Sequence, residues 1–240
     1  MRAVVMLYGV MSYLLFFAVF LYLIAFVGGF YVPIHLSITT EGGGTLALVI
    51  NIMLLLLWGV QHSVMARDWY KKAIETVIPH HLERSTYVLV STITLAVVMV
   101  LWQPMSGEIW RIEEGALQVV VWGLFALGWT ITLISTFLTD HFDLFGLRHS
   151  WLHFVEKTYT DVRFTERWIY SWIRHPMMLG LLISFWLVPV MTVGHLVFSI
   201  GMSLYIFIGI HFEEQALVKA VGESYSHYQK RTSKIIPKIY

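Results

Sequence analysis

Residues 4–30 read VVMLYGVMSYLLFFAVFLYLIAFVGGF, an apolar run without a single charged side chain. A helix of about 20 apolar residues crosses the roughly 30 Å hydrocarbon core of a bilayer, so this run predicts a transmembrane helix. It has no cleavage site of small residues, and we therefore expect a retained helix and not a signal peptide.

Similar apolar runs recur along the chain, and together they predict an all-α, polytopic integral-membrane helical bundle. We expect six spans, at Val4–Phe30, Thr45–Val64, Ser85–Trp102, Leu117–Leu138, Met177–Met191 and Leu196–Ile210. The last two are too short to cross upright, which predicts a tilted or shallow hairpin that turns at residues 192–195. A short amphipathic helix is expected around Phe212–Arg231, and residues 1–240 are expected to form one domain.

The composition agrees with a membrane protein and excludes several other classes. Of the 240 residues, 58% are hydrophobic and 13% are charged, against about 45–50% and 25% in soluble domains. The net charge of +1 offers no basic field for nucleic acid, so we expect none as a partner. With no cysteine, the chain has no disulfide, thiolate metal ligand or cysteine nucleophile.

The distribution of lysine and arginine predicts the orientation, because these residues accumulate in cytoplasmic loops. With six crossings and both termini cytoplasmic, fifteen of the sixteen basic residues fall on the cytoplasmic side, and only Arg111 lies outside. A count of five crossings would place the basic tail outside. We therefore expect both termini to lie in the cytoplasm.

The segment Arg174-His175-Pro176 stands at the start of the fifth expected span. Proline suits the first turn of a helix, and the free N–H groups there favour a carboxylate or a phosphate. Arg174 and His175 are therefore candidates for binding an anionic group. The simpler interpretation is that Arg174 reaches lipid phosphate and that His175 caps the helix.

Glu213 and Glu214 directly follow the last expected span and return to the same side as Arg174. Successive helical residues diverge by about 100°, so we expect one of the two to point inward. That carboxylate is suited to pair with Arg174 or to bind an ammonium group. Tyr225 and Tyr228 share a helix face, and they are candidates either for contact with a nucleoside or for anchoring at the membrane interface.

A second polar patch covers Asp140-His141-Phe142-Asp143 and extends to His149. Carboxylates and histidines so close together suit acid–base chemistry. The two histidines of this patch are eight residues apart, and we expect no metal site there.

Taken together, Arg174-His175-Pro176-x-x-x-Gly180, Glu213-Glu214-x-x-Leu217, Gly222-x-x-Tyr225-x-x-Tyr228 and Pro237 resemble the isoprenylcysteine carboxyl methyltransferase superfamily. Met178 departs from the tyrosine frequent there. Three further segments are similar to a bacterial branch of thiol methyltransferases and nitrite-reductase-associated proteins, namely Gln61-His-Ser-Val-Met-Ala-Arg67, Glu83-Arg-Ser-Thr-Tyr87 and Asp140-His-Phe-Asp-Leu-Phe-Gly146.

The resemblance implies an integral-membrane enzyme of a bacterial inner membrane. It implies that this enzyme uses S-adenosylmethionine and methylates methanethiol to dimethyl sulfide. It implies a cofactor-binding region over residues 170–237, with Arg174, His175, Pro176, Gly180, Glu214, Tyr225 and Tyr228 as binding residues. Arg174, Glu213, Glu214, His141 and Asp140 are then the catalytic candidates, and which of them activates the thiol stays open.

Other activities remain open at this point. The methyl acceptor could be another thiol, a prenylcysteine or a phospholipid. A membrane sterol-type reductase and a non-enzymatic membrane protein of nitrogen-oxide metabolism are further alternatives. The sequence leaves the oligomeric state open.

Overall fold

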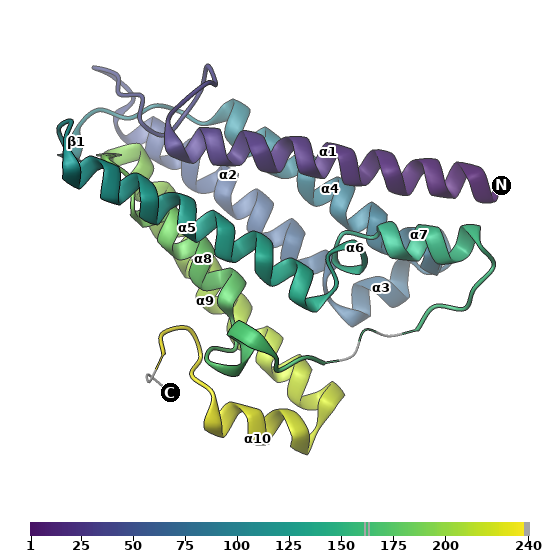
Figure 1. The fold of residues 1–240 in the computed structure, drawn as a ribbon. Helices are drawn as coiled ribbons and strands as arrows, with labels where there is room; N and C mark the ends of the chain where they lie inside the picture. Colours follow the sequence, from purple (N-terminus) through teal and green to yellow (C-terminus); the bar gives the residue numbers. More distant parts are fainter. Residues whose placement is uncertain (161, 163, 238–240) are drawn as a thin grey trace. The chain divides into compact units, whose positions relative to one another are not determined.

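Helices account for nearly all regular structure in the computed structural model, which describes residues 1–160, 162 and 164–237 (Figure 1). Arg163 and Lys238, which entered the charge count, lie outside the described residues. The elements in chain order are α1 (Arg2–Gly28), α2 (Gly44–Met65), α3 (Asp68–Ile74), α4 (His80–Leu101), β1 (Glu108–Arg111), α5 (Ala116–Thr139), α6 (His141–Leu144), α7 (Leu147–Phe154), the 3-10 helix η1 (Trp168–Ser171), α8 (Pro176–Trp186), β2 (Val190–Thr192), α9 (Val193–Val221) and α10 (Glu223–Arg231).

The expected helical membrane protein is confirmed. Within the described residues, α1, α2, α4, α5 and α9 are long and apolar enough to cross a bilayer. The short α8 and α9 form the expected hairpin. Its turn lies between Trp186 and Val193, through β2, and not at residues 192–195 as expected, because α9 already begins at Val193. The paired strands β1 and β2 are a small addition that the sequence did not indicate.

Two helix boundaries correct the expectation. The last expected span, Leu196–Ile210, lies inside α9, which has 29 residues and ends only at Val221. The separate helix expected from Phe212 is therefore only α10, which begins after Gly222, where φ is 74°. Likewise, α4 begins at His80, directly after Pro79, and not at Ser85.

The length of α9 determines the depth of its carboxylates. At 1.5 Å per residue, α8 is only about 16 Å long, whereas α9 reaches about 43 Å. Glu213 lies twenty residues after Val193, so it is about 30 Å along the helix. This is the thickness of the hydrocarbon core, so α9 carries Glu213 and Glu214 at one membrane boundary.

The described chain divides into two compact units, and it enters each of them more than once. Unit 1 contains Met1–Gly107, Asp140–Val162 and Thr192–Gly194, whereas unit 2 contains Glu108–Thr139, Arg163–Met191 and His195–Tyr240. The single domain over residues 1–240 stays a prediction.

In unit 1, α1 packs against α4 and α7, and α4 also packs against α2. The approach of α1 to α7 depends on Gly9, because a Cβ there would lie 2.3 Å from Oγ of Ser150. Small residues at such crossings let membrane helices pack closely.

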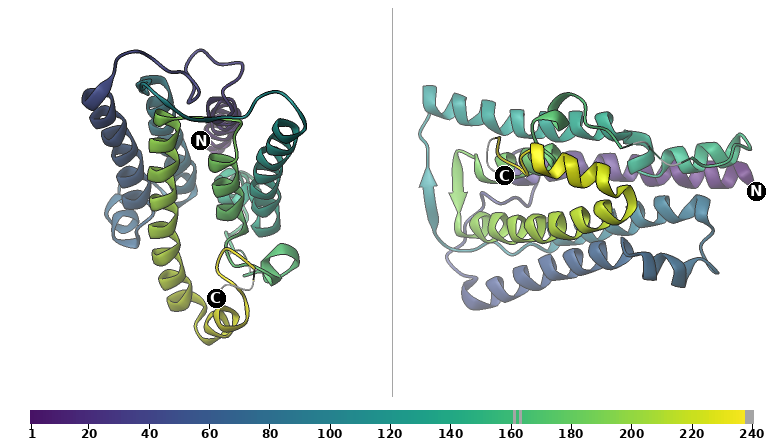
Figure 2. Two further views of the ribbon diagram at one scale, coloured as in Figure 1. Left: turned by 90° about the vertical axis from the view of Figure 1, so that its left-hand side faces the viewer. Right: turned by 90° about the horizontal axis from the view of Figure 1, so that it is seen from below.

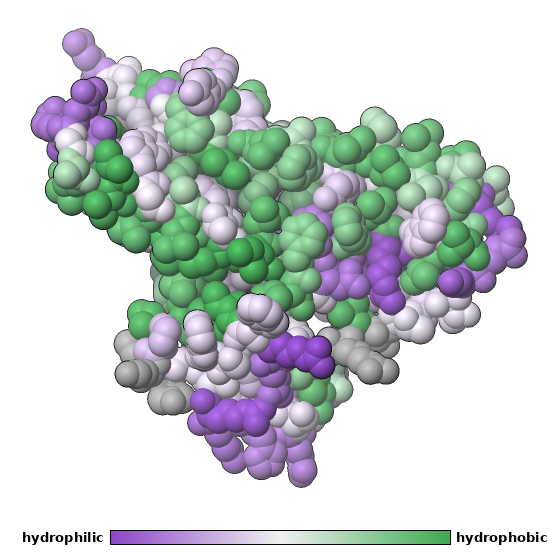
Figure 3. Space-filling view, in the orientation of Figure 1, coloured by the Kyte–Doolittle hydropathy of each residue, from purple (hydrophilic) through white to green (hydrophobic). Residues whose placement is uncertain are grey.

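In unit 2, α5 packs closely against α8, and α9 lies beside α8 (Figure 2). A Cβ on Gly180 of α8 would lie 2.5 Å from the carbonyl oxygen of Gly128 on α5. Phe185 sits between Trp129 and Phe198 at the other end of α8. In Figure 3, the surface over α1 and α5 is mostly hydrophobic, whereas the surface over α10 is mostly hydrophilic.

Candidate functional site

The start of α8 is held by the tail of the chain. Pro176 occupies the first turn of α8, where its missing N–H leaves no hydrogen bond unmade. The two residues before it pair with the tail, because the main-chain N–H of Arg174 donates to Ser233 O and that of His175 donates to Lys234 O, at 2.8 and 3.1 Å. This parallel bridge fixes the backbone from which both side chains project.

Arg174 is buried, with 8% of its surface exposed. Its Nε donates to Oε1 of Glu214 at 2.7 Å, and its Nη1 donates to the carbonyl oxygens of Gln229 and Thr232. The guanidinium is therefore bound inside unit 2 and does not extend to lipid phosphate. Among the described residues, no hydrogen bond uses Nη2.

His175 lies between the two glutamates of α9. Its Nε2 is 3.1 Å from Oε1 of Glu214, and its Nδ1 is 3.5 Å from Oε2 of Glu213. Its side chain makes no capping hydrogen bond to α8, so the expectation of a simple helix cap is wrong. The imidazole has a carboxylate beside each nitrogen.

Only one of the two glutamates is buried, as expected from their helical spacing. The side chain of Glu214 is 10% exposed, whereas that of Glu213 is 48% exposed. The second oxygen of Glu214 faces Lys234 Nζ at 3.6 Å. Arg174, His175, Glu213 and Glu214 thus form one cluster, which we call the α8–α9 charge cluster.

The other residues expected to bind a cofactor have structural contacts of their own. Gly180 lies against α5, as described above. Tyr225 and Tyr228 are each 1% exposed and pack against one another and against Phe164, so neither is an exposed interfacial anchor. Burial raises the pKa of both phenols and keeps them neutral. Their contact with a ligand stays a prediction.

Tyr170 and the tail residues Thr232–Lys234 belong to the same region, although no motif marked them as individual site residues. The Tyr170 carbonyl accepts a hydrogen bond from the Tyr228 hydroxyl. Burial and the charge of Glu213 raise the pKa of Tyr170 to about 12. The backbone bridge between Ile173 and Ser233 could not be found from the sequence, because a single bridge produces no periodic pattern of residues.

Asp140 and His141 belong to unit 1. Oδ1 of Asp140 accepts the N–H of Asp143 at 3.0 Å and caps α6, with the Asp140 backbone at the unusual φ of 116°. His141 is 4% exposed, and its Nε2 lies 2.9 Å from the Tyr13 hydroxyl. Burial lowers the pKa of His141, with the charge of Asp140 opposing it, so its imidazole is neutral near pH 7.

Four histidines gather where α7 meets the start of α4, again in unit 1. His149 and His153 are four residues apart on α7, a spacing readable in the sequence, and they face His80 and His81 on α4. The rings of His81 and His153 stack at 3.7 Å.

Asp143 lies beside this group of histidines. Burial opposes its ionisation, but the neighbouring His149 and the hydrogen bond from Arg148 outweigh burial and lower the pKa of its carboxyl. Across the described ranges, no group of three or more His, Cys, Asp or Glu side chains is arranged to hold a metal ion.

The apolar spans of the described chain, together with the α8–α9 charge cluster, define a polytopic integral-membrane protein with a polar site at one membrane boundary. The model of the family described as NnrU protein matches residues 50–239. The chain therefore belongs to the NnrU protein family.

The chain is also similar over nearly its whole length to curated bacterial proteins. It is 41% identical to a methanethiol S-methyltransferase of Mycobacterium tuberculosis, over 98% of the chain and 97% of that protein. It is 42% identical to one of Crocosphaera subtropica, over 98% and 92%. For methanethiol S-methyltransferase 1 of Bradyrhizobium diazoefficiens, the identity is 40%, over 98% and 83%. No solved structure shows a significant match.

Proposed function

We propose that this chain is an integral-membrane methyltransferase that converts methanethiol to dimethyl sulfide, with S-adenosylmethionine as the methyl donor. The main support for this reaction is the near full-length similarity to proteins named methanethiol S-methyltransferase. The donor is supported by the family resemblance and by the chemistry of the α8–α9 charge cluster.

The residues of this cluster suit the amino-acid end of S-adenosylmethionine. A free carboxylate fits Nη2 of Arg174, which makes no hydrogen bond with the described residues. This nitrogen lies beside the start of α8, where helix N–H groups also favour an anion. An ammonium group fits the half-exposed carboxylate of Glu213. Residues 170–237 would thus form the donor-binding region, with Glu214 holding Arg174 and His175 in place.

The bound donor supplies an electrophilic methyl group on a sulfonium, and the thiol sulfur takes that methyl as it loses its proton. Methyl transfer between two sulfur atoms needs an in-line approach. Positioning of the two reactants by the protein therefore provides most of the reduction of the activation barrier. A base is also needed, because thiols are mostly protonated at neutral pH. His141, neutral near pH 7 and bound to Tyr13, is one candidate, and Asp140, Glu213 and Glu214 remain others.

The membrane location suits these two reactants. A small apolar thiol partitions into lipid, whereas the charged donor arrives through water. We propose that the charge cluster faces the cytoplasm of a bacterial inner membrane, with both termini inside, as the bias of basic residues indicates. Reporter fusions test this: a reporter after Lys157 should lie inside and one after Gly107 outside, and an external tail would contradict it.

The reaction is tested with purified protein, methanethiol and S-adenosylmethionine carrying a CD₃ methyl group. Mass spectrometry of the headspace should detect dimethyl sulfide with one labelled methyl. A prenylcysteine, a longer thiol and phospholipid vesicles serve as competing acceptors. No labelled dimethyl sulfide, together with label in one of these acceptors, would overturn the proposed substrate.

Binding of the donor is tested separately by calorimetry with S-adenosylhomocysteine. Arg174→Lys keeps the positive charge but removes the planar group that binds Glu214 and the tail together. We expect binding at least about tenfold weaker in this variant, because a hydrogen bond to a charged group contributes about 1.5–3 kcal/mol. Lys219→Arg, at the end of α9, is the matched control. Equal affinity of both variants for S-adenosylhomocysteine would show that Arg174 does not belong to the donor-binding site.

A further inference from the structure

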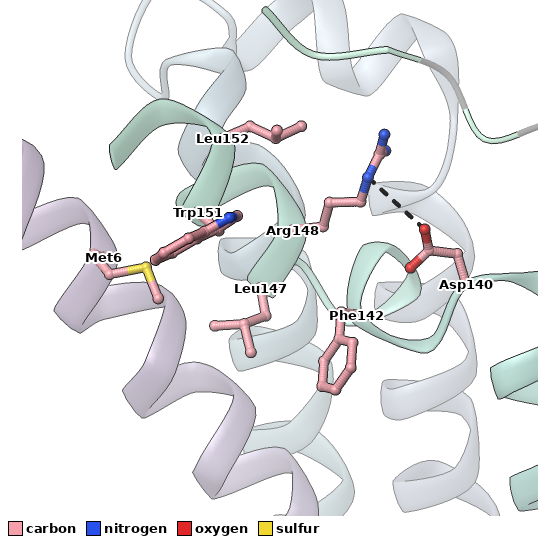
Figure 4. A pocket seen from close by; sticks show the side chains of 7 residues that line it. All are labelled: Met6, Asp140, Phe142, Leu147, Arg148, Trp151 and Leu152. Carbon is pink, nitrogen blue, oxygen red and sulfur yellow. Dashed lines mark ion pairs between the residues drawn. The ribbon is translucent and has the colours of Figure 1, made fainter. Parts of the chain in front are cut away.

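A pocket of about 480 Å³ lies between the first turns of α1 and the segment α6–α7, entirely within unit 1 (Figure 4). Its walls are mainly apolar, with Met6 from α1 and Leu147, Trp151 and Leu152 from α7. A thiol with two heavy atoms fills about 60 Å³, at roughly 30 Å³ for each water-sized group. The pocket is several times larger and has the size of sites for much larger ligands.

The pocket lies at the boundary between hydrocarbon and headgroups. Met6 belongs to the second turn of α1, and Asp140 directly follows Thr139, the last residue of α5. Both helices are long enough to span the membrane, so their ends lie at its surface. Phe142 and Trp151 are 47% and 49% exposed, as suits aromatic residues at the membrane interface. A ligand here would have an apolar part and a polar end.

At the polar rim, a guanidinium nitrogen and a carboxylate oxygen form an ion pair, but neither atom makes a hydrogen bond with the described residues (Figure 4). Nε of Arg148 and Oδ2 of Asp140 face each other at 3.8 Å, which is too long for a hydrogen bond. The other guanidinium nitrogens of Arg148 donate to Asp143 and Thr160. The other oxygen of Asp140 accepts the N–H of Asp143. A headgroup that both accepts and donates fits this pair.

We propose that this pocket binds one bilayer phospholipid with a primary ammonium headgroup, a phosphatidylethanolamine. A phosphate oxygen accepts from Nε of Arg148, and the ammonium group donates to Oδ2 of Asp140. An acyl chain lies against Met6, Leu147 and Trp151. The lipid would bind whether or not the chain methylates a thiol, so the two proposals fail separately.

The test compares two lipids on the full chain, delipidated in mild detergent. Phosphatidylethanolamine and phosphatidylcholine with identical acyl chains are titrated, and bound lipid is counted by native mass spectrometry. Phosphatidylcholine has the same charges but no N–H group to donate to Asp140. We expect one phosphatidylethanolamine to bind about tenfold more tightly, since a hydrogen bond to a carboxylate is lost with phosphatidylcholine.

Two variants separate the pocket from the general lipid-facing surface. Leu147→Trp fills the apolar part of the pocket and should abolish the tight binding. Ala96→Trp places the same bulk in a groove of about 350 Å³ between α1 and α4, whose wall carries no charged side chain, and should leave the binding intact. Equal affinity for both lipids on the unmodified chain would overturn the proposal, even if Leu147→Trp fails to fold. Unchanged binding in a folded Leu147→Trp protein would overturn it as well.

Discussion

Nε of Arg174 donates a 2.7 Å hydrogen bond to Oε1 of Glu214, forty residues later, and both side chains are buried. Removing one partner of a buried ion pair leaves the other charge desolvated, which costs about 3–5 kcal/mol. Arg174→Ala and Glu214→Ala should each lower the melting temperature of the detergent-solubilised protein markedly. The double variant Arg174→Met with Glu214→Leu should lose less than the sum of the two single variants.

An exposed ion pair between α10 and the segment before η1 provides the control for this prediction. Arg231 and Glu166 also form an ion pair, but the side chain of Arg231 is 62% exposed. Exposed pairs contribute about 0–1 kcal/mol, so Arg231→Ala should change the melting temperature little. If Arg231→Ala and Arg174→Ala lowered the melting temperature equally, the buried ion pair would contribute no more to stability than the exposed one, which would contradict the prediction.

Glu213 and Glu214 should separate binding from stability. Glu214 contacts the buried side chains of Arg174 and His175, whereas Glu213 is half-exposed beside Nδ1 of His175. Glu213→Gln should raise the KM for the methyl donor and leave the melting temperature close to that of the natural chain. Glu214→Gln should impair both. A Glu213→Gln protein with unchanged KM would exclude Glu213 from the donor site.

Gly180 should be needed for the packing of α5 against α8. A Cβ at this position would lie 2.5 Å from the Gly128 carbonyl, whereas a Cβ at Gly123, also on α5, would meet nothing within 4 Å. Gly180→Ala should therefore destabilise the protein by about 1–3 kcal/mol through overpacking, and Gly123→Ala should not. Thermal unfolding of the two alanine variants checks this difference. If Gly180→Ala unfolds at the same temperature as Gly123→Ala, the close approach is not required.

The sequence predicted the spans because a hydrocarbon core requires long apolar helices. It also predicted the pairing of Arg174 with Glu214, because a hairpin returns the chain to the same membrane boundary. It did not predict the length of α9, since a helix that has crossed a bilayer is free to continue in water with charged residues. The isolated bridge between Ile173 and Ser233 was missed because a single bridge has no periodic pattern. The spacing of His149 and His153 was readable, but their partners on α4 came from tertiary packing.

Activity should not depend on a metal ion. The stacked rings of His81 and His153 lie only 9° from parallel. The lone pairs of imidazole nitrogens lie in the ring plane, so those of two parallel rings do not converge on one point. Activity should therefore persist after treatment with a chelator and desalting. A loss that one particular divalent ion restores would contradict this, and His149→Ala would then show whether the group of four histidines binds that ion.

Stability should fall in acid because of His141. Burial lowers its pKa in the folded protein below the usual value of 6.5, so between the two values the unfolded chain binds the proton more strongly. The contribution of neutral His141 to the stability of the folded protein is therefore fully present above about pH 6.5. It is lost as the pH falls toward the pKa of His141 in the folded protein. The loss is about 1.4 kcal/mol for each unit by which the pKa is lowered.

His141→Asn removes this titration and should flatten the decline in melting temperature between pH 7 and pH 5. Tyr13→Phe removes the hydroxyl that contacts the imidazole at 2.9 Å but keeps the buried ring, so the decline should remain in that variant. If His141→Asn and the natural chain lose stability in parallel as the pH falls, another group is responsible for the acid sensitivity. If His141 is also the base, only its neutral imidazole can accept the proton of the thiol. The activity of the natural chain should then rise with pH.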